Sequence, residues 1–211
     1  MPARHALVPG EGSSGHKPLC VERTEVTVAS FEPCVSAGKC KAPRGVTEHF
    51  RCNRGDKARQ NHPINCIDQA TAAAYCSWRA RRLPTDEEWT WAAHGGPRRL
   101  KYPWGTDPLH ERVCYRAHRT GEGSCEVGTY PSGKSVDGID DLMGNMGEWS
   151  ATIRPSSACK ELCCKRWGGV FSDDAEFLSG AFERGSNADC TATTFGNGLR
   201  CVAEPAVESA P

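Results

Sequence analysis

The chain has 211 residues, 38% of them hydrophobic, which is enough for one domain of ordinary size around a single core. Basic and acidic residues number 26 each, so net charge gives no attraction for nucleic acid or for an anionic membrane surface. No apolar run approaches the ~18 residues of a membrane-spanning helix. Composition therefore argues against nucleic acid as a partner and predicts no membrane span.

The N-terminal part is expected to begin with a disordered leader at residues 1–18, which are rich in glycine, proline, serine and histidine. These residues contain no apolar segment typical of a signal peptide. The following segment Thr24–Phe31 alternates apolar and polar side chains, which predicts a strand. We expect the folded domain to span residues 19–203 and residues 204–211 to form a tail.

A first helix is predicted at Gln69–Arg79, because Asp68 can cap its N-terminus. Four apolar residues at helical spacing are expected to form its buried stripe. They are Ala70, Ala73, Ala74 and Trp78.

A second helix is predicted to start at Asp86. Thr85 and Glu88 have the spacing of a capping box, in which each side chain binds a free backbone N–H of the other's residue. Gly95 and Gly96 are expected to end this helix. Beyond it, glycine and proline recur every few residues, which predicts short strands and long ordered loops.

Thirteen cysteines in a chain of this length indicate disulfide bonds and an oxidising, extracytoplasmic compartment. Three pairs bracket loops rich in glycine, asparagine or proline and are predicted to be local bridges. These pairs are Cys34 with Cys40, Cys52 with Cys66, and Cys114 with Cys125. Because the number of cysteines is odd, at least one thiol must be free or bonded outside the chain.

Five cysteines have no partner that the sequence identifies: Cys20, Cys159, Cys163, Cys164 and Cys190. The last four could form disulfides, or they could bind a soft metal ion. Their spacing is not that of a zinc ribbon, which favours disulfides. A free or intermolecular thiol is the third alternative.

Several segments together resemble the formylglycine-generating enzyme family, also called sulfatase-modifying factors. In chain order they are HPINCIDQATAAAYCSW at 62–78, RLPTDEEWTWAAHGG at 82–96, YPWG at 102–105, GIDDLMGNMGEW at 138–149 and GLRC at 198–201. The resemblance implies an α+β fold, a loop-rich elaboration of the C-type lectin fold with little regular secondary structure. It also implies a disulfide between Cys76 and Cys201.

Enzymes of this family oxidise a cysteine with O2 at a copper(I) ion held by two cysteines that follow a Gly-Gly-Ser-Trp motif. The matching segment here is Gly168–Phe171, with Val170 in place of the serine. The resemblance places Asp173 and Leu178 at the two copper ligands, and this pair cannot hold copper(I), which prefers soft sulfur. Copper is therefore not expected. The leading hypothesis is a binding or accessory module for a protein, peptide or glycan.

An alternative is an oxidoreductase of the same superfamily that uses another metal in the same cleft. Asp173, Asp174 and Glu176 are the candidate catalytic or metal-binding groups, although a solvated acidic loop would have the same composition. The seven histidines show no H-x3-H pair and no facial triad.

The resemblance also implies a calcium site in GIDDLMGNMGEW. Asp141, Asn145 and Glu148 match the family's calcium segment, and the carbonyl groups of Gly144 and Met146 match its backbone ligands. Calcium prefers hard oxygen ligands of this kind. Alternatively, Asp141 and Asn145 only shape the turn and Glu148 pairs with an arginine.

Overall fold

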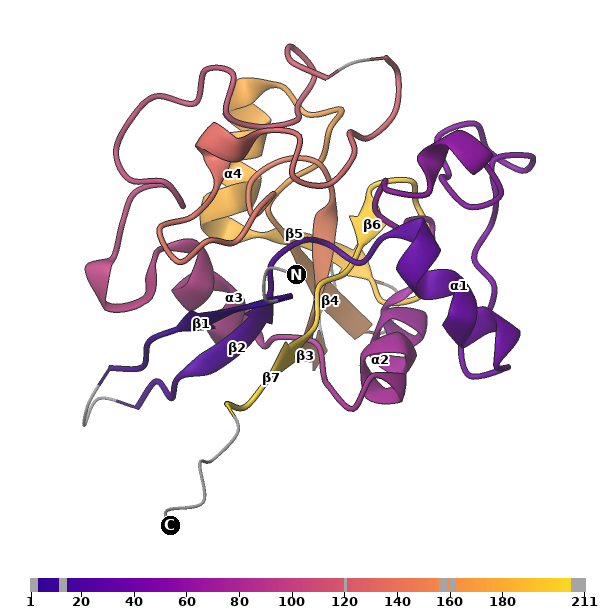
Figure 1. Ribbon diagram of the computed structural model, residues 1–211, viewed down its shortest axis with the longest axis horizontal. Helices are drawn as coiled ribbons and strands as arrows, with labels where there is room; N and C mark the ends of the chain where they lie inside the picture. The colour runs from indigo at the N-terminus through magenta and orange to yellow at the C-terminus, as the bar shows by residue number, and fades with distance from the viewer. Residues whose placement is uncertain (1–3, 12–14, 120, 156–158, 160–161, 206–211) are drawn as a thin grey trace.

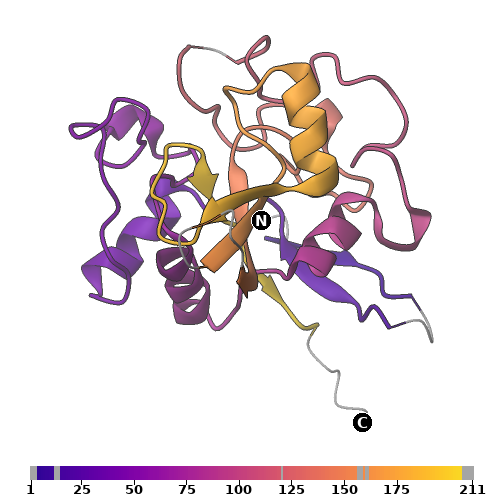
Figure 2. The same cartoon turned by 180° about the vertical axis from the view of Figure 1, so that it is seen from behind.

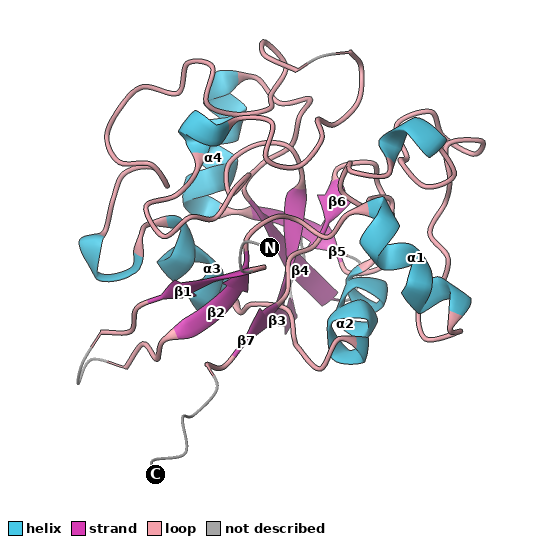
Figure 3. Ribbon diagram, in the orientation of Figure 1, coloured by secondary structure: helices cyan, strands magenta, loops and turns pink. Residues whose placement is uncertain are grey.

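Two small sheets, four α-helices and long loops form the protein in the computed structural model, which describes residues 4–11, 15–119, 121–155, 159 and 162–205. Loops, drawn in pink, occupy most of the upper half of the molecule in Figure 3. This mixed, loop-rich α+β architecture is the one predicted from the sequence. No helix in the described part of the chain is long and apolar enough to cross a membrane.

The first sheet joins the two ends of the chain. Its order is β1 (His5–Val8), β2 (Leu19–Glu22) and β7 (Val202–Ala203), and both pairs are antiparallel (Figure 1). Alternate residues of β1 and β2 are buried, with Ala6 and Val8 on β1. The prediction of a disordered leader is therefore wrong for His5–Val8, because this short alternating segment finds a partner strand in β2. Residues 1–3, 12–14 and 206–211 lie outside the described residues.

The second sheet forms the centre of the molecule. Its order is β5 (Ser186–Asp189), β4 (Leu162–Trp167), β3 (Gly147–Pro155) and β6 (Asn197–Gly198). The β3 strand is antiparallel to β4 and parallel to β6. Its first four residues are buried, so the end of the calcium-like segment is fixed within the core.

The α1 helix (Val28–Ser36) replaces the strand predicted at Thr24–Phe31. Thr27 and Ser30 form a capping box, so the helix begins where the alternating pattern suggested an extended chain. Val28, Phe31 and Cys34 are buried, and their spacing of three matches a helical face. The sequence pattern is compatible with a strand and with a helix, and burial of this face favours the helix.

The α2 helix (Gln69–Trp78) is capped by Asp68 as predicted. Its buried face differs from the predicted stripe, because Ala70 is exposed and Ala73, Ala74 and Trp78 are only partly buried. The side chains that enter the core are those of Thr71, Ala72, Tyr75 and Cys76. The disulfide of Cys76 fixes this orientation.

The α3 helix (Asp86–Ala93) confirms the capping box. The Glu88 N–H donates to Thr85 Oγ1 at 3.1 Å, and the Thr85 N–H donates to Glu88 Oε2 at 2.9 Å. Gly95 follows in the left-handed conformation with φ 71°, which suits glycine at a helix end. The described loops also contain the 3-10 helices η2 (Lys57–Arg59), η3 (Gly96–Arg98) and η4 (Pro131–Gly133).

The α4 helix (Ala175–Arg184) was not predicted. Asp174 caps it, and Leu178, Ala181 and Phe182 form its buried face. Figure 2 shows α4 at the front of the rear view, leading directly into β5. The recurring glycines and the acidic residues Asp173, Asp174 and Glu176 suggested a loop, whereas the apolar face gives a helix.

Six disulfides are formed within the described residues. They include the four predicted pairs, Cys34–Cys40, Cys52–Cys66, Cys76–Cys201 and Cys114–Cys125. The other two are Cys159–Cys163 and Cys164–Cys190, so the disulfide alternative holds for these cysteines and the soft-metal alternative is wrong. Cys20, on β2, is the one free cysteine of the described chain.

Candidate functional site

The segment that matches the copper motif lies between β4 and α4, and it brings Asp173 and Leu178 together at one glycine. Gly169 has φ 76°, and a Cβ atom there would lie 2.5 Å from Leu178 Cδ1 and 3.1 Å from Asp173 Oδ2. Leu178 is fully buried in the core cluster that includes Trp89 and Trp167. The second expected copper-ligand position, that of Leu178, is therefore filled by a packed apolar side chain.

The three acidic candidates have local structural roles. Asp173 Oδ2 accepts a hydrogen bond of 2.8 Å from the Val170 N–H, and burial raises the pKa of this carboxyl. Asp174 Oδ1 caps α4 through the Phe177 N–H, and Glu176 is exposed in the first turn. Across the described residues, no three His, Cys, Asp or Glu side chains are placed to hold a metal ion.

A cluster of aromatic rings and arginines includes Phe171 of this motif, and the sequence analysis missed it. The rings of Phe171 and Phe195 lie 5.7 Å apart. The Arg51 guanidinium carbon is 4.9 Å from the Phe195 ring, and that of Arg119 is 5.7 Å from the Phe171 ring. Two buried arginine nitrogens, Arg51 Nε and Arg119 Nη1, have no hydrogen-bond partner among the described residues. These residues are far apart in sequence, so no local pattern could have grouped them.

The predicted calcium segment forms a tight, buried turn. Asp141 and Asn145 both adopt left-handed conformations, with φ 59° and 53°. Asp141 Oδ2 accepts from the Gly128 N–H at 2.6 Å. Asn145 Oδ1 accepts from the Cys125 N–H at 3.0 Å, so the side chain of Asn145 ties the turn to a disulfide loop.

Glu25 is a buried partner of this turn that the sequence analysis did not identify. Its carboxylate is 1% exposed and accepts from Asn145 Nδ2 at 2.7 Å and from the Met146 N–H at 2.9 Å. Both polar groups of the Asn145 amide are thus engaged in hydrogen bonds within the protein. The available family-type ligands are the Asp141 carboxylate, the Glu148 carboxylate and backbone carbonyl groups.

Glu148 forms a buried ion pair with Arg200, as in the alternative considered from the sequence. Arg200 Nη2 lies 2.7 Å from Glu148 Oε1, and Arg200 Nε donates to both oxygens at 3.1 and 3.2 Å. Trp89 Nε1 also donates to Glu148 Oε2 at 2.7 Å. The arginine belongs to the GLRC motif, so the motif was a signal that could have identified it.

The charges around this turn do not balance. Two buried carboxylates, Glu25 and Glu148, and the partly buried carboxylate of Asp141 interact with one buried guanidinium, that of Arg200. Burial, reinforced by neighbouring carboxylates, raises the pKa of Glu25 well above its ordinary value, and burial raises the pKa of Asp141 to about 6. An added cation would offset the excess negative charge. Calcium prefers hard oxygen ligands of the kind found in this turn, and a calcium site here stays a prediction.

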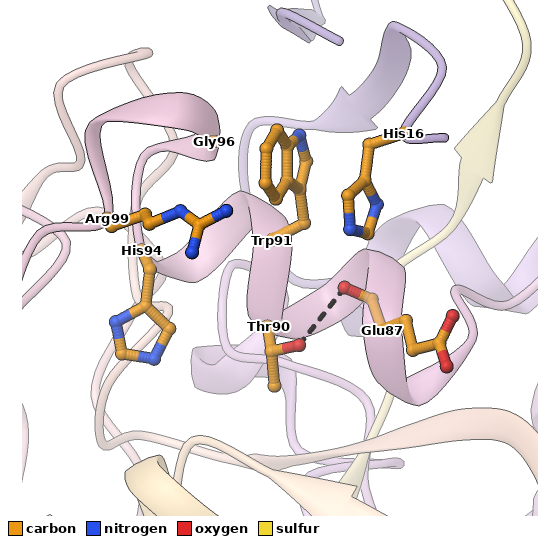
Figure 4. A pocket seen from close by; sticks show the side chains of 7 residues that line it. All are labelled: His16, Glu87, Thr90, Trp91, His94, Gly96 and Arg99. Atoms are coloured by element: carbon orange, nitrogen blue, oxygen red, sulfur yellow. Dashed lines mark hydrogen bonds between the residues drawn. The ribbon is translucent and has the colours of Figure 1, made fainter. Parts of the chain in front are cut away.

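Recessed surfaces lie elsewhere on the molecule. Figure 4 shows one of about 380 Å³ on α3, where the His16 ring stacks on Trp91 at 4.0 Å and Arg99 lies on the opposite side of the indole. Another, of about 440 Å³, follows α4 and includes Asp174 and Glu176 in its lining. A third, of about 740 Å³, lies between the start of α1 and the end of α2.

Residues 9–205 match the family model of the sulfatase-modifying factor enzyme 1-like domain, which covers nearly the whole chain. The chain belongs to the FGE-sulfatase family. The segments that resemble the family in sequence, from HPINC to GLRC, all lie within the matched range.

Curated members of the family that resemble this chain differ in their described activities. The inactive C-alpha-formylglycine-generating enzyme 2 of Mus musculus is 38% identical over 104 residues, covering 44% of this chain and 33% of the relative. The formylglycine-generating enzyme of Thermomonospora curvata is 36% identical over 106 residues, covering 44% and 34%. Hercynine oxygenase of Mycobacterium tuberculosis is 33% identical over 116 residues, covering 53% and 27%. The alignments thus span about a third of these relatives or less.

Solved structures share the fold over nearly the whole length of the FGE-sulfatase chain. The crystal structure of CarF has a TM-score of 0.73 at 17% identity, covering 96% of this chain and 98% of CarF. PvdO from Pseudomonas aeruginosa has a TM-score of 0.66 at 18% identity, covering 97% and 92%. At these identities the likeness shows the fold alone, and it confirms the formylglycine-generating enzyme-like elaboration of the C-type lectin fold.

Proposed function

We propose that this FGE-sulfatase family member is a binding or accessory module without copper-dependent cysteine oxidase activity. The observation that carries the proposal is the fully buried Leu178 at the second expected copper-ligand position. Its side chain packs against Gly169 and supplies no electron pair for a metal. Asp173, at the first position, is engaged with the Val170 N–H instead.

The comparisons agree with a scaffold that is retained after the chemistry is lost. One curated relative is described as inactive, whereas others are described as a formylglycine-generating enzyme and as an oxygenase. Family membership alone therefore does not carry an activity to this chain. The replaced ligand positions favour the inactive class.

Calcium is the proposed stabilising ion. Asp141 and Glu148 would provide carboxylate oxygens, and Gly144 and Met146 would provide carbonyl oxygens. The excess of buried negative charge supports this assignment. Bound calcium would supply a positive charge that holds the turn on the core.

An extracytoplasmic location is also part of the proposal. Six disulfides in a chain of this size support it, because cytosolic thiols are usually kept reduced. The partner would be a protein, peptide or glycan in that compartment.

The test is incubation of the oxidised protein with copper(I), O2 and a Cys-x-Pro-x-Arg peptide, followed by mass spectrometry for the aldehyde. We expect no aldehyde, whereas the Thermomonospora curvata enzyme should produce it in a parallel reaction. Turnover above the protein-free control would refute the proposal. Metal analysis of the purified protein is the second arm, and a transition metal lost on Asp173→Ala would instead support the alternative oxidoreductase.

A further inference from the structure

A recess of about 740 Å³ lies away from both the copper-motif position and the α3 pocket. Its walls come from β1, from the connection between β2 and α1, and from the C-terminal end of α2. In Figure 1 that connection crosses the front of the molecule towards α1. A volume of this size is in the range of sites for small organic ligands, which is about 300–1,000 Å³.

The acidic groups of this recess are already engaged by the protein. Glu25 is 1% exposed and is bound by the calcium-like turn. Glu22 accepts from Arg81 Nη1 at 3.0 Å and from the Cys201 N–H at 3.1 Å. Asp140 pairs with Lys134 at 3.3 Å. The carboxylates that line the recess therefore already have partners within the protein.

Two of the basic groups that line the recess, Arg4 and Arg79, are exposed. Their positive field acts on His5, whose pKa is lowered by burial and by the four nearest arginines. Arginine presents a planar fork of donors that matches the oxygens of a carboxylate or a sulfate.

An aromatic ledge lies next to these arginines. The Trp78 ring is half-buried, and the Arg79 guanidinium carbon lies 5.8 Å from its centroid. The Tyr75 ring is 5.9 Å from Trp78 and tilted by 49°. A bare inorganic anion would not use this apolar surface, and a neutral sugar would not use the arginines.

We infer that this recess binds an acidic sugar, a pyranose ring that carries a carboxylate or a sulfate. The C–H face of the ring would pack on Trp78 and the anionic group would bind Arg79 and Arg4. This assignment rests on the proposed binding function and names a ligand class for it. It does not involve the copper-motif position.

The test is binding of four probes to the full chain, followed by tryptophan fluorescence and by saturation-transfer NMR. The probes are glucuronic acid, glucose 6-sulfate, glucose and inorganic sulfate. We expect at least one acidic sugar to bind about tenfold more tightly than glucose or inorganic sulfate, since a charge-assisted bidentate contact changes the Kd by about this factor. Raising the salt concentration about tenfold should weaken this binding.

Two single variants assign the site. Arg79→Gln should raise the Kd of the acidic sugar about tenfold, and its circular dichroism should be unchanged because the side chain is exposed. Arg99→Gln is the matched control, since Arg99 is also exposed but lines the α3 pocket instead. Its affinity should equal that of the parent protein.

Three results would overturn the inference. The first is no binding of either acidic sugar at a concentration of about 100 mM, which is about 100 times a millimolar Kd. The others are equal affinity for glucose and for the acidic sugars, or an unchanged affinity in Arg79→Gln. The comparison of glucuronic acid with glucose 6-sulfate distinguishes the two anionic groups. Failure here with no aldehyde in the peptide assay would leave the proposed function intact. Aldehyde formation would refute the proposed function whatever the sugars do.

Discussion

Replacing Arg200 should cause the largest loss of stability of any single polar substitution in the described core. The side chain is 1% exposed and its donors reach three separate segments. Besides the pair with Glu148, Arg200 Nη1 donates to the Glu22 carbonyl and Nη2 to the Asp140 carbonyl, each at 2.8 Å. One guanidinium thus joins β2, the calcium-like turn and β3 in a common arrangement.

The magnitude follows from what Arg200→Met leaves behind. Glu148 would become a buried carboxylate with no cation, beside Asp141 and Glu25, and breaking a buried pair in this way costs about 3–5 kcal/mol. Each of the two carbonyl groups that lose a donor adds about 1–3 kcal/mol. Because contributions in one network are not additive, we expect a loss of about 5 kcal/mol or more. A domain of this kind has only about 5–15 kcal/mol in total.

The assay is urea denaturation of the oxidised protein, followed by tryptophan fluorescence. Arg200→Lys is the graded variant, because it keeps the charge but not the forked contacts, and it should lose less stability than Arg200→Met. The double variant Arg200→Met, Glu148→Met should recover part of the loss, since no buried charge is left alone. A loss below about 1 kcal/mol in Arg200→Met, or no recovery in the double variant, would contradict this reasoning.

Three further outcomes are expected. Calcium at about 100 times its Kd should add about 2.7 kcal/mol to the free energy of unfolding and raise the melting temperature of chelator-treated protein by several degrees, with a weaker response in Glu148→Gln. An unchanged melting temperature, with no calcium in the purified protein, would leave the segment as an ordinary turn. Replacing Cys76 and Cys201 by serine should lower the free energy of unfolding by about 4–5 kcal/mol in denaturant unfolding, because their disulfide closes a loop of 125 residues. A smaller loss than on removal of Cys159–Cys163, which closes the shortest loop, would contradict the chain-entropy account. Leu178→Ala should cost about 2–5 kcal/mol, whereas a neutral effect would mean that this position is not packed core.

Local chemistry explains which elements were predictable. The α3 helix was placed correctly because Thr85 and Glu88 cap it through contacts only three residues apart. The segment at α1 was mistaken for a strand because its alternating pattern also fits a helix. Only the burial of Val28, Phe31 and Cys34 against the core separates the two.

The same limit applies to the cysteines. Pairs that bracket a short loop could be assigned, because their separation along the chain brings them together. Cys163 and Cys164 could not, since adjacent residues of a strand point to opposite faces of the sheet. The β4–β5 register aligns Cys164 with Ala188, which brings Cys190 within reach, while Cys163 turns to Cys159.

The sequence by itself determined the scaffold, because family membership depends on residue identities within contiguous motifs, and it predicts that the copper-binding cysteines are replaced. It also indicated the calcium-like turn. Only the tertiary structure decided that Glu25 and Arg200 join this turn, that Leu178 fills the position beside Gly169, and that exposed arginines meet Trp78 in one recess. Electrostatic balance and packing depend on distances between segments that lie far apart in the chain, and folding sets those distances.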